Sequence, residues 1–205
     1  MVTKENIAII IPFHKNIEML RLSIHTLEDS ITGEKPQIII IGNNNNPNEL
    51  NLIEIEFGQY DIYKIPENLF WPGAINFGSR QTDKEYLLFC DPDLFYTEKW
   101  LDNLLDCYNQ HKNVGAVSAK IINPLNNRIM DFGMGYNHFN TIHIGKDLPI
   151  NHPTTLEDRK VQAACGAVFL TSHELFKRVN GIDTSMPYIY LSLIHISEPT
   201  RQEAI

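Results

Sequence analysis

Two aspartates separated by one residue, Asp91 and Asp93, follow directly after the apolar run 86–89. An apolar run bounded by proline is typical of a buried strand, so both carboxylates are expected at the edge of a sheet. Open α/β sheets bind ligands there, and Mg²⁺ is usually held by one or two carboxylates together with substrate phosphates. The pair therefore predicts a divalent-metal site, with a solvated turn rich in Asp and Pro as the simpler alternative.

Alternating strands and helices are predicted around this pair. Continuous apolar runs indicate strands that are covered on both faces, and apolar residues at three- and four-residue spacing indicate helices. The expected strands cover residues 7–12, 38–41, about 60–65 and 86–89. The expected helices cover residues 17–27, 50–57, 72–82 and 100–108, the third opened by its proline. Strands that alternate with helices favour a mostly parallel, Rossmann-like α/β sheet flanked by helices.

The pattern changes beyond Val114. Strands are expected at 114–122 and 161–170, with a long irregular stretch rich in Gly, Asn and His between them. Thr171 and Glu174 fit a capping box, which predicts a short helix that ends near Gly181. The two halves of the chain are therefore expected to differ in regularity.

Composition excludes several classes of protein. The chain has 205 residues, 43% of them hydrophobic, which is enough for one domain with a buried core. A formal charge of −8 argues against a nucleic-acid partner, and no apolar run reaches the roughly 18 residues of a transmembrane helix. The N-terminus lacks the apolar core of a signal peptide. Three cysteines without metal-like spacing predict free thiols in a reducing compartment, and three scattered histidines (His138, His143 and His152) show no ligand pattern.

Several segments resemble, in their order along the chain, the family 2 glycosyltransferases of the GT-A fold. These segments are 9–13, 38–46, 73–78, 90–93, 166–170, 173–176 and 179–183. The resemblance extends over roughly residues 6–190. It implies a GT-A-like fold that is incomplete at its C-terminus, with 1–113 as the nucleotide-sugar-binding half and 114–190 as the acceptor-side half of the same domain.

The resemblance implies an inverting transfer of a sugar from a nucleotide-diphosphate donor to an acceptor hydroxyl. The acceptor would be a glycan or a lipid-linked molecule, and the usual setting is surface polysaccharide synthesis. By the same resemblance, Asp93 would hold Mg²⁺ or Mn²⁺, which neutralises the departing diphosphate. The implied donor-binding residues are Pro12, Phe13, His14, Asn43, Asn44, Asn76 and Asp91. Asn76 has an equal alternative as a structural residue.

The sequence departs from the family pattern at two places. The loop after the second strand usually carries an aspartate that reads the base, and this position is Gly42, followed by four asparagines. After Tyr190 the family would continue into an acidic segment that supplies the catalytic base. Residues 191–205 instead resemble a translated sequencing adapter, so they are expected to be a non-native tail and the base to be absent, which leaves this chain inactive. A cytoplasmic location is expected, with membrane association of the full-length protein left open.

Two functions other than glycosyl transfer are alternatives for this sequence. A sugar nucleotidyltransferase of similar fold would need a basic, glycine-rich triphosphate loop after the first strand, and residues 12–16 offer one lysine and no glycine. A non-catalytic module that binds a nucleotide or a glycan is the alternative from a different class. A purely structural role is least favoured, because it leaves the aspartate pair without a purpose.

Overall fold

A computed structural model describes residues 1–136 and 141–185, and it contains a central six-stranded mixed sheet. The strands lie in the order β3-β2-β1-β4-β10-β5. They are β1 (Ile7–Phe13), β2 (Gln37–Asn43), β3 (Asp61–Ile65), β4 (Tyr86–Cys90), β5 (Ala116–Ser118) and β10 (Val168–Ser172). The first four are mutually parallel, and β10 runs antiparallel to both β4 and β5. The prediction of a mostly parallel α/β sheet is confirmed.

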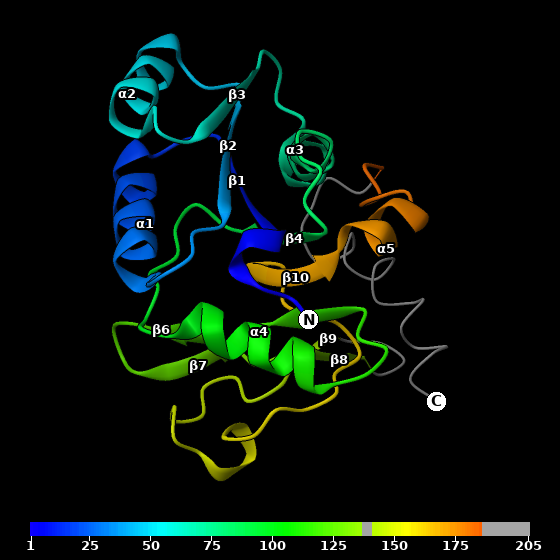
Figure 1. The fold of residues 1–205 in the computed structure, drawn as a ribbon. Coiled ribbons are helices and arrows are strands. Elements are labelled where there is room, and N and C mark those ends of the chain that lie inside the picture. Colours follow the sequence, from blue (N-terminus) through cyan, green and yellow to red (C-terminus); the bar gives the residue numbers. More distant parts are fainter. Residues whose placement is uncertain (137–140, 186–205) are drawn as a thin grey trace.

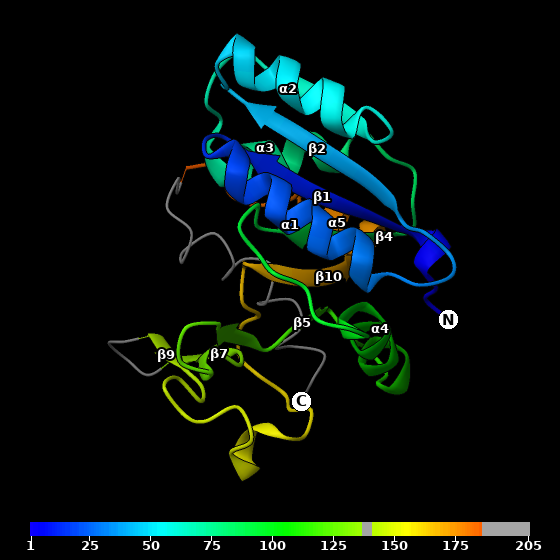
Figure 2. The same cartoon turned by 90° about the vertical axis from the view of Figure 1, so that its left-hand side faces the viewer.

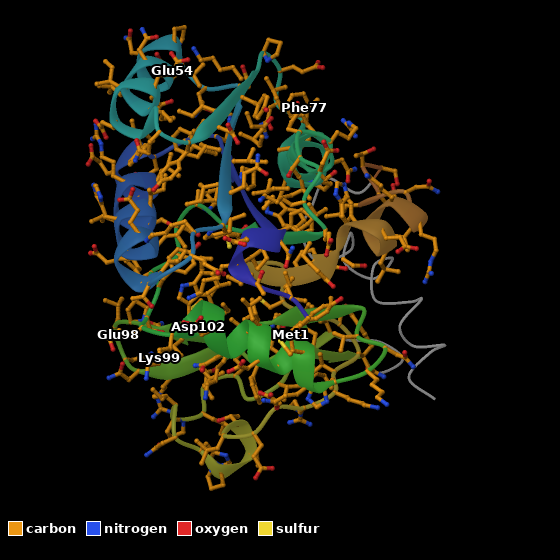
Figure 3. The ribbon with its side chains drawn as sticks, in the orientation of Figure 1. Met1, Glu54, Phe77, Glu98, Lys99 and Asp102 are labelled. Carbon is orange, nitrogen blue, oxygen red and sulfur yellow. The ribbon has the colours of Figure 1, made fainter. Side chains whose placement is uncertain are left out.

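Helices cover both faces of the sheet (Figure 1). On one face pack α1 (Ile17–Ser30), α2 (Pro47–Phe57) and α4 (Trp100–Gln110). On the other face pack α3 (Phe70–Ser79) and the short α5 (His173–Arg178). In Figure 3, Glu54 of α2 and Phe77 of α3 lie on opposite sides of the strands, with side chains filling the space between the layers.

The central strand β1 supplies side chains to two hydrophobic cores. Ile7, Ile9 and Ile11 belong to the core beneath α1, whereas Ala8 and Ile10 belong to the core beneath α3. All five are fully buried, because successive strand residues point to opposite faces and both faces are covered. Burial of each isoleucine contributes roughly 1.5–3 kcal/mol, so the continuous apolar run in the sequence reflects a strand enclosed on both sides.

The second half of the chain is built from short, partly exposed pieces (Figure 2). One two-stranded sheet pairs β6 (Ile121–Asn123) with β7 (Arg128–Asp131), and another pairs β8 (Met134–Tyr136) with β9 (Thr141–His143). Single 3-10 turns occur at η1 (Lys4–Asn6) and η2 (Pro153–Thr155). Within the two described ranges, no helix is both long and apolar enough to cross a bilayer.

Several predicted boundaries are wrong in the second half. The expected strand 114–122 is divided into β5 and β6, and only the last part of 161–170 belongs to a strand, β10. The N-cap of α5 is Ser172, whose side chain accepts a hydrogen bond from the Leu175 N–H. Thr171 lies one residue before the cap, and its hydroxyl instead donates to the Gly115 carbonyl (2.7 Å).

One boundary in the first half also differs. Helix α3 begins at Phe70, so Pro72 is the third helical residue and does not open the helix. A proline is tolerated there because the first N–H groups of a helix have no partner within it.

Candidate functional site

Loops from four parallel strands meet at one edge of the sheet. His14 follows β1, Asn43 ends β2, Asn68 follows β3 and Asp91 follows β4. The chain passes from β1 outward to β2 and β3, then returns to place β4 on the other side of β1. The strand order therefore reverses between β1 and β4, and ligands of open α/β sheets bind outside the carboxyl ends of the strands at such a reversal.

Asp91 is held in place by two hydrogen bonds. Its backbone N–H donates to the carbonyl of Ala167 (2.8 Å), just ahead of β10. The indole N–H of Trp71, from α3, donates to its Oδ1 (2.9 Å). Asp91 is half-buried, whereas Asp93 is exposed in the turn that follows. The structure therefore brings the two carboxylates to the same edge, one fixed and one open to solvent.

The charges of this pair are not neutralised by any described side chain. Within residues 1–136 and 141–185, no Lys or Arg forms an ion pair with Asp91 or Asp93. Burial, and then the neighbouring Asp93 carboxylate, raise the pKa of Asp91 to about 7, against the hydrogen bond from Trp71, which lowers it. Hard oxygen donors with uncompensated charge at an open edge suit Mg²⁺ or Mn²⁺, so the residues present fit a divalent cation.

A polar network joins the loops after β1, β2 and β3. The ring of His14 contacts the Asn43 carbonyl through Nδ1 (2.7 Å) and lies 3.5 Å from the Asn68 amide nitrogen through Nε2. The side chain of Asn43 donates to Asn68 Oδ1 (3.0 Å) and to the Phe70 carbonyl (3.2 Å), and it accepts from the Leu69 N–H (2.9 Å). These bonds fix the three loops relative to one another.

The four asparagines after Gly42 have different environments. Asn43 is buried and its amide is fully occupied by the network, and Asn45 donates to the His14 carbonyl (2.7 Å). Asn46 caps α2 by accepting from the Asn48 N–H. Asn44 is exposed, has a left-handed backbone (φ 59°), and binds the Ile65 carbonyl only through its backbone N–H (2.9 Å). Of the two asparagines predicted to contact the base, Asn44 is the one whose side chain is exposed.

Gly42 has a packing explanation. A Cβ added there would lie 2.6 Å from the Leu50 side chain of α2, well inside contact distance. The glycine therefore allows α2 to approach the end of β2. An aspartate at this position, as the family usually has, would displace Leu50.

The remaining predicted donor residues lie deeper in the fold. Pro12 is buried in β1, and Phe13 is 1% exposed in the core beneath α1. Asn76, on α3, uses both ends of its amide on the backbone of Ile182, donating to its carbonyl (2.7 Å) and accepting from its N–H (2.8 Å). The structure thus places Asn76 as a link between α3 and the segment after α5.

A second polar cluster, which the sequence did not suggest, lies on the hairpins of the second half. Asp131, at the end of β7, is 4% exposed; it pairs with His143 of β9 and accepts from the Gly133 N–H (2.7 Å). Burial, and then Asp131, raise the pKa of the nearby Cys165 to about 12, with a smaller contribution from Asp91. Cys165 is therefore influenced by the charges of both Asp131 and Asp91. Of these residues, the sequence drew attention only to His143, because Asp131, His143 and Cys165 are well separated along the chain.

The other histidines and the C-terminal segment were also subjects of sequence-based predictions. His152 accepts from the Thr154 N–H at the start of η2 (3.4 Å), which is a structural role. His138, the segment after Tyr190 in which the catalytic base was expected, and the predicted non-native tail 191–205 lie outside the described residues.

Two solved structures share this fold. A mannosyltransferase from Pyrobaculum calidifontis, in complex with GDP-Man and Mn²⁺, superposes with a TM-score of 0.61 at 12% identity, over 90% of this chain and 49% of that one. GalNAc-T7, with UDP, GalNAc and Mn²⁺, superposes with a TM-score of 0.68 at 13% identity, over 95% of this chain and 40% of that one. The likeness shows a GT-A-type α/β fold, as predicted.

Sequence comparison gives the family. The minor teichoic acid biosynthesis protein GgaB of Bacillus subtilis (strain 168) is 26% identical over 115 residues, which are 52% of this chain and 12% of GgaB. The chain therefore matches only a small part of that relative and less than half of each solved structure. The sequence model of the family described as glycosyl transferase family 2 matches residues 8–178. Because that match spans most of the chain, the protein belongs to glycosyl transferase family 2.

Proposed function

We propose that the edge formed by Asp91 and Asp93 binds the diphosphate of a nucleotide-sugar donor together with Mg²⁺ or Mn²⁺. One observation carries the proposal: an exposed and a half-buried carboxylate, without an ion-pair partner among the described residues, stand where the strand order reverses. The two structural neighbours were both solved with a nucleotide or nucleotide sugar and Mn²⁺, which supports the same ligands here.

Each described residue has a distinct part in this proposal. Asp93 holds the cation, and Asp91, fixed by Trp71 and Ala167, faces the ribose. His14 and Asn44 line the base side of the site, whereas Asn43 positions the loops through its internal bonds. Pro12 and Phe13 shape the site from within β1. A bound divalent cation would neutralise the charge of the departing diphosphate.

The proposed reaction is transfer of the donor sugar to an acceptor hydroxyl with inversion at the anomeric carbon. Residues 1–113 would serve the donor and residues 114–190 the acceptor. The name of GgaB favours a cell-surface polymer or its lipid-linked precursor as the acceptor. An inverting transfer needs a general base opposite the leaving group. Since that base is expected beyond the described residues, no described residue is assigned the role.

Thermal melts with UDP, GDP and dTDP, each with and without Mn²⁺, test the donor site. A ligand at about 100 times its Kd stabilises the folded state by about 2.7 kcal/mol, which corresponds to a rise in Tm of about 5–10 °C for a domain of this size. We expect a rise that requires both the nucleotide and the metal. A cooperative melt that none of these ligands moves would contradict the proposal.

Substitution of the metal-binding residue sharpens this test. Asp93→Asn is expected to abolish the metal-dependent rise in Tm, because an amide lacks the charge that holds the cation. Glu98→Gln is the matched control: Glu98 is also exposed, and it lies near the start of α4 (Figure 3). It should leave the rise unchanged. Release of free nucleotide from a donor sugar in the presence of acceptor would then separate an enzyme from a non-catalytic binding module.

A further inference from the structure

Three potential metal ligands converge at the end of α4, away from the donor site. Cys107 lies in the last turns of α4, and His111 directly follows the helix, four residues later. Asp158 belongs to the loop after η2. One ligand atom from each residue lies within 4.8 Å of the other two. In both ribbon views, α4 and this loop lie near each other at the lower end of the molecule (Figures 1 and 2).

The spacing within α4 explains half of this arrangement. Residues four apart lie on the same face of a helix, so the Cys107 thiol and the His111 imidazole point to the same side. Cys107 is half-buried, whereas His111 and Asp158 are exposed and can adjust their rotamers. In a tetrahedral site, a sulfur and a nitrogen atom bound to the same zinc ion lie roughly 3.5 Å apart. The side chains would therefore need to close by up to roughly 1.3 Å, which rotation of the two exposed side chains can supply.

The loop that carries Asp158 has few other attachments. Among the described residues, the segment 156–161 makes no backbone–backbone hydrogen bond. Asp158 brings this loop to the end of α4, where its carboxylate lies within 4.8 Å of the Cys107 thiol. Burial, and then this carboxylate, raise the pKa of Cys107 to about 12. A metal ion would displace the Cys107 proton, since thiols bind metals as thiolates and release the proton.

We propose that Cys107, His111 and Asp158 form a zinc site that fastens the 156–161 loop to the end of α4. Sulfur, imidazole nitrogen and carboxylate oxygen are the three ligand types that Zn²⁺ takes in proteins, and a water molecule would complete a tetrahedron. The ligand set contains a soft sulfur donor, which distinguishes it from the all-oxygen site at Asp93. The two sites are independent, so failure of either proposal leaves the other standing.

Titration of the whole chain with Co²⁺ and Zn²⁺ tests the site. Co²⁺ bound to a thiolate gives a sulfur-to-metal charge-transfer absorption, which the carboxylates at the donor site cannot produce. We expect this band to saturate at about one Co²⁺ per chain and to disappear when Zn²⁺ is added. Competition with a chromophoric chelator then gives the Zn²⁺ affinity. Loss of a metal's outer-shell partner costs about 10–100-fold in affinity, so loss of a direct ligand should cost about 100-fold or more.

The variants identify the ligands. Cys107→Ser should remove the band, and the substitutions His111→Ala and Asp158→Asn, both at exposed positions that do not threaten folding, should each weaken Zn²⁺ binding by that factor. Glu157→Gln and Cys165→Ser are the matched controls and should bind as the unaltered chain does. Absence of the band in the unaltered chain, its loss in Cys165→Ser, or unchanged affinity in both His111→Ala and Asp158→Asn would overturn the proposal.

Discussion

The first half of the chain, residues 1–113, and the second half, residues 114–185, use their apolar residues differently. The first half places continuous isoleucine and leucine runs in strands that helices enclose on both sides. The second half uses strands of three to five residues, of which β6 to β9 form two small sheets apart from the central one. The parallel strands therefore fix the position of the aspartate pair, and the second half contacts it through the Ala167 carbonyl, just ahead of β10.

Truncation of an isoleucine should have the most different effects on stability in the two halves of the chain. Ile10→Ala, at a fully buried position in β1, is expected to lower the free energy of unfolding by about 2–5 kcal/mol, because it leaves a cavity between the sheet and α3. The matched change Ile142→Ala, at a residue 48% exposed in β9, should stay within about 0.5 kcal/mol. Urea denaturation of both variants measures the difference. Equal losses would mean that the second half is as tightly packed as the first.

Addition of a methyl group tests whether the packed layers have room for a larger side chain. Gly78→Ala would place a Cβ 2.6 Å from Ile10 and 3.3 Å from Ile41, so α3 must move away from the sheet. We expect a loss of about 1–3 kcal/mol in the free energy of unfolding. Gly135→Ala in β8 meets nothing nearer than 3.6 Å and should change stability little. Chemical denaturation of the pair checks this, and a larger loss at Gly135 would reverse the comparison.

The hydrogen bonds between Asn76 and Ile182, which link the two halves of the chain, should contribute measurably to the free energy of unfolding. Asn76→Ala leaves both backbone groups of the buried Ile182 without their present partner, which is expected to cost about 1–3 kcal/mol. Asn76→Asp can still accept from the Ile182 N–H but cannot donate to its carbonyl. Hydrogen exchange at the Ile182 amide should therefore be faster in the alanine variant than in the aspartate variant. Identical protection in both variants would show that the N–H bond contributes nothing.

The smallest effect is expected at the cap of α5. Ser172→Ala removes the acceptor for the Leu175 N–H and should cost about 1 kcal/mol. Ser172→Asn keeps a side-chain acceptor and should retain most of the stability. Thermal melts of the two variants provide the measurement. If alanine and asparagine behave alike, the second half does not depend on this cap.

The sequence was sufficient to predict secondary structure where an element is buried on both faces, because burial there requires apolar residues. The apolar runs at β1, β2 and β4 and the helical spacing in α1 and α4 predicted their elements to within a few residues. It was insufficient for β5 and β6, because a single apolar stretch gives no sign of where the chain leaves one sheet for another. The resemblance to family 2, and with it the fold, came from the order of several weak motifs, and the family match confirmed it.

The site was predictable only in part, for a related reason. Asp91 and Asp93 are separated by one residue and follow a strand, so their place at the sheet edge could be predicted. The bonds of Asn43 with Asn68, and of Asn76 with Ile182, join residues whose proximity depends on the tertiary fold. Likewise, Cys107 and His111 have helical spacing, but Asp158 completes their cluster from a distant loop.

The position of β10 has a consequence for how the protein is made. Its pairing with β4 places the last described strand inside the sheet, between β4 and β5, and next to Asp91. During synthesis, β4 therefore remains an open edge with unpaired N–H and C=O groups until Val168–Ser172 has left the ribosome. Any shorter chain, whether nascent or cut by a protease, exposes a fully apolar strand to pairing with another molecule. The late return of the chain therefore covers this apolar edge.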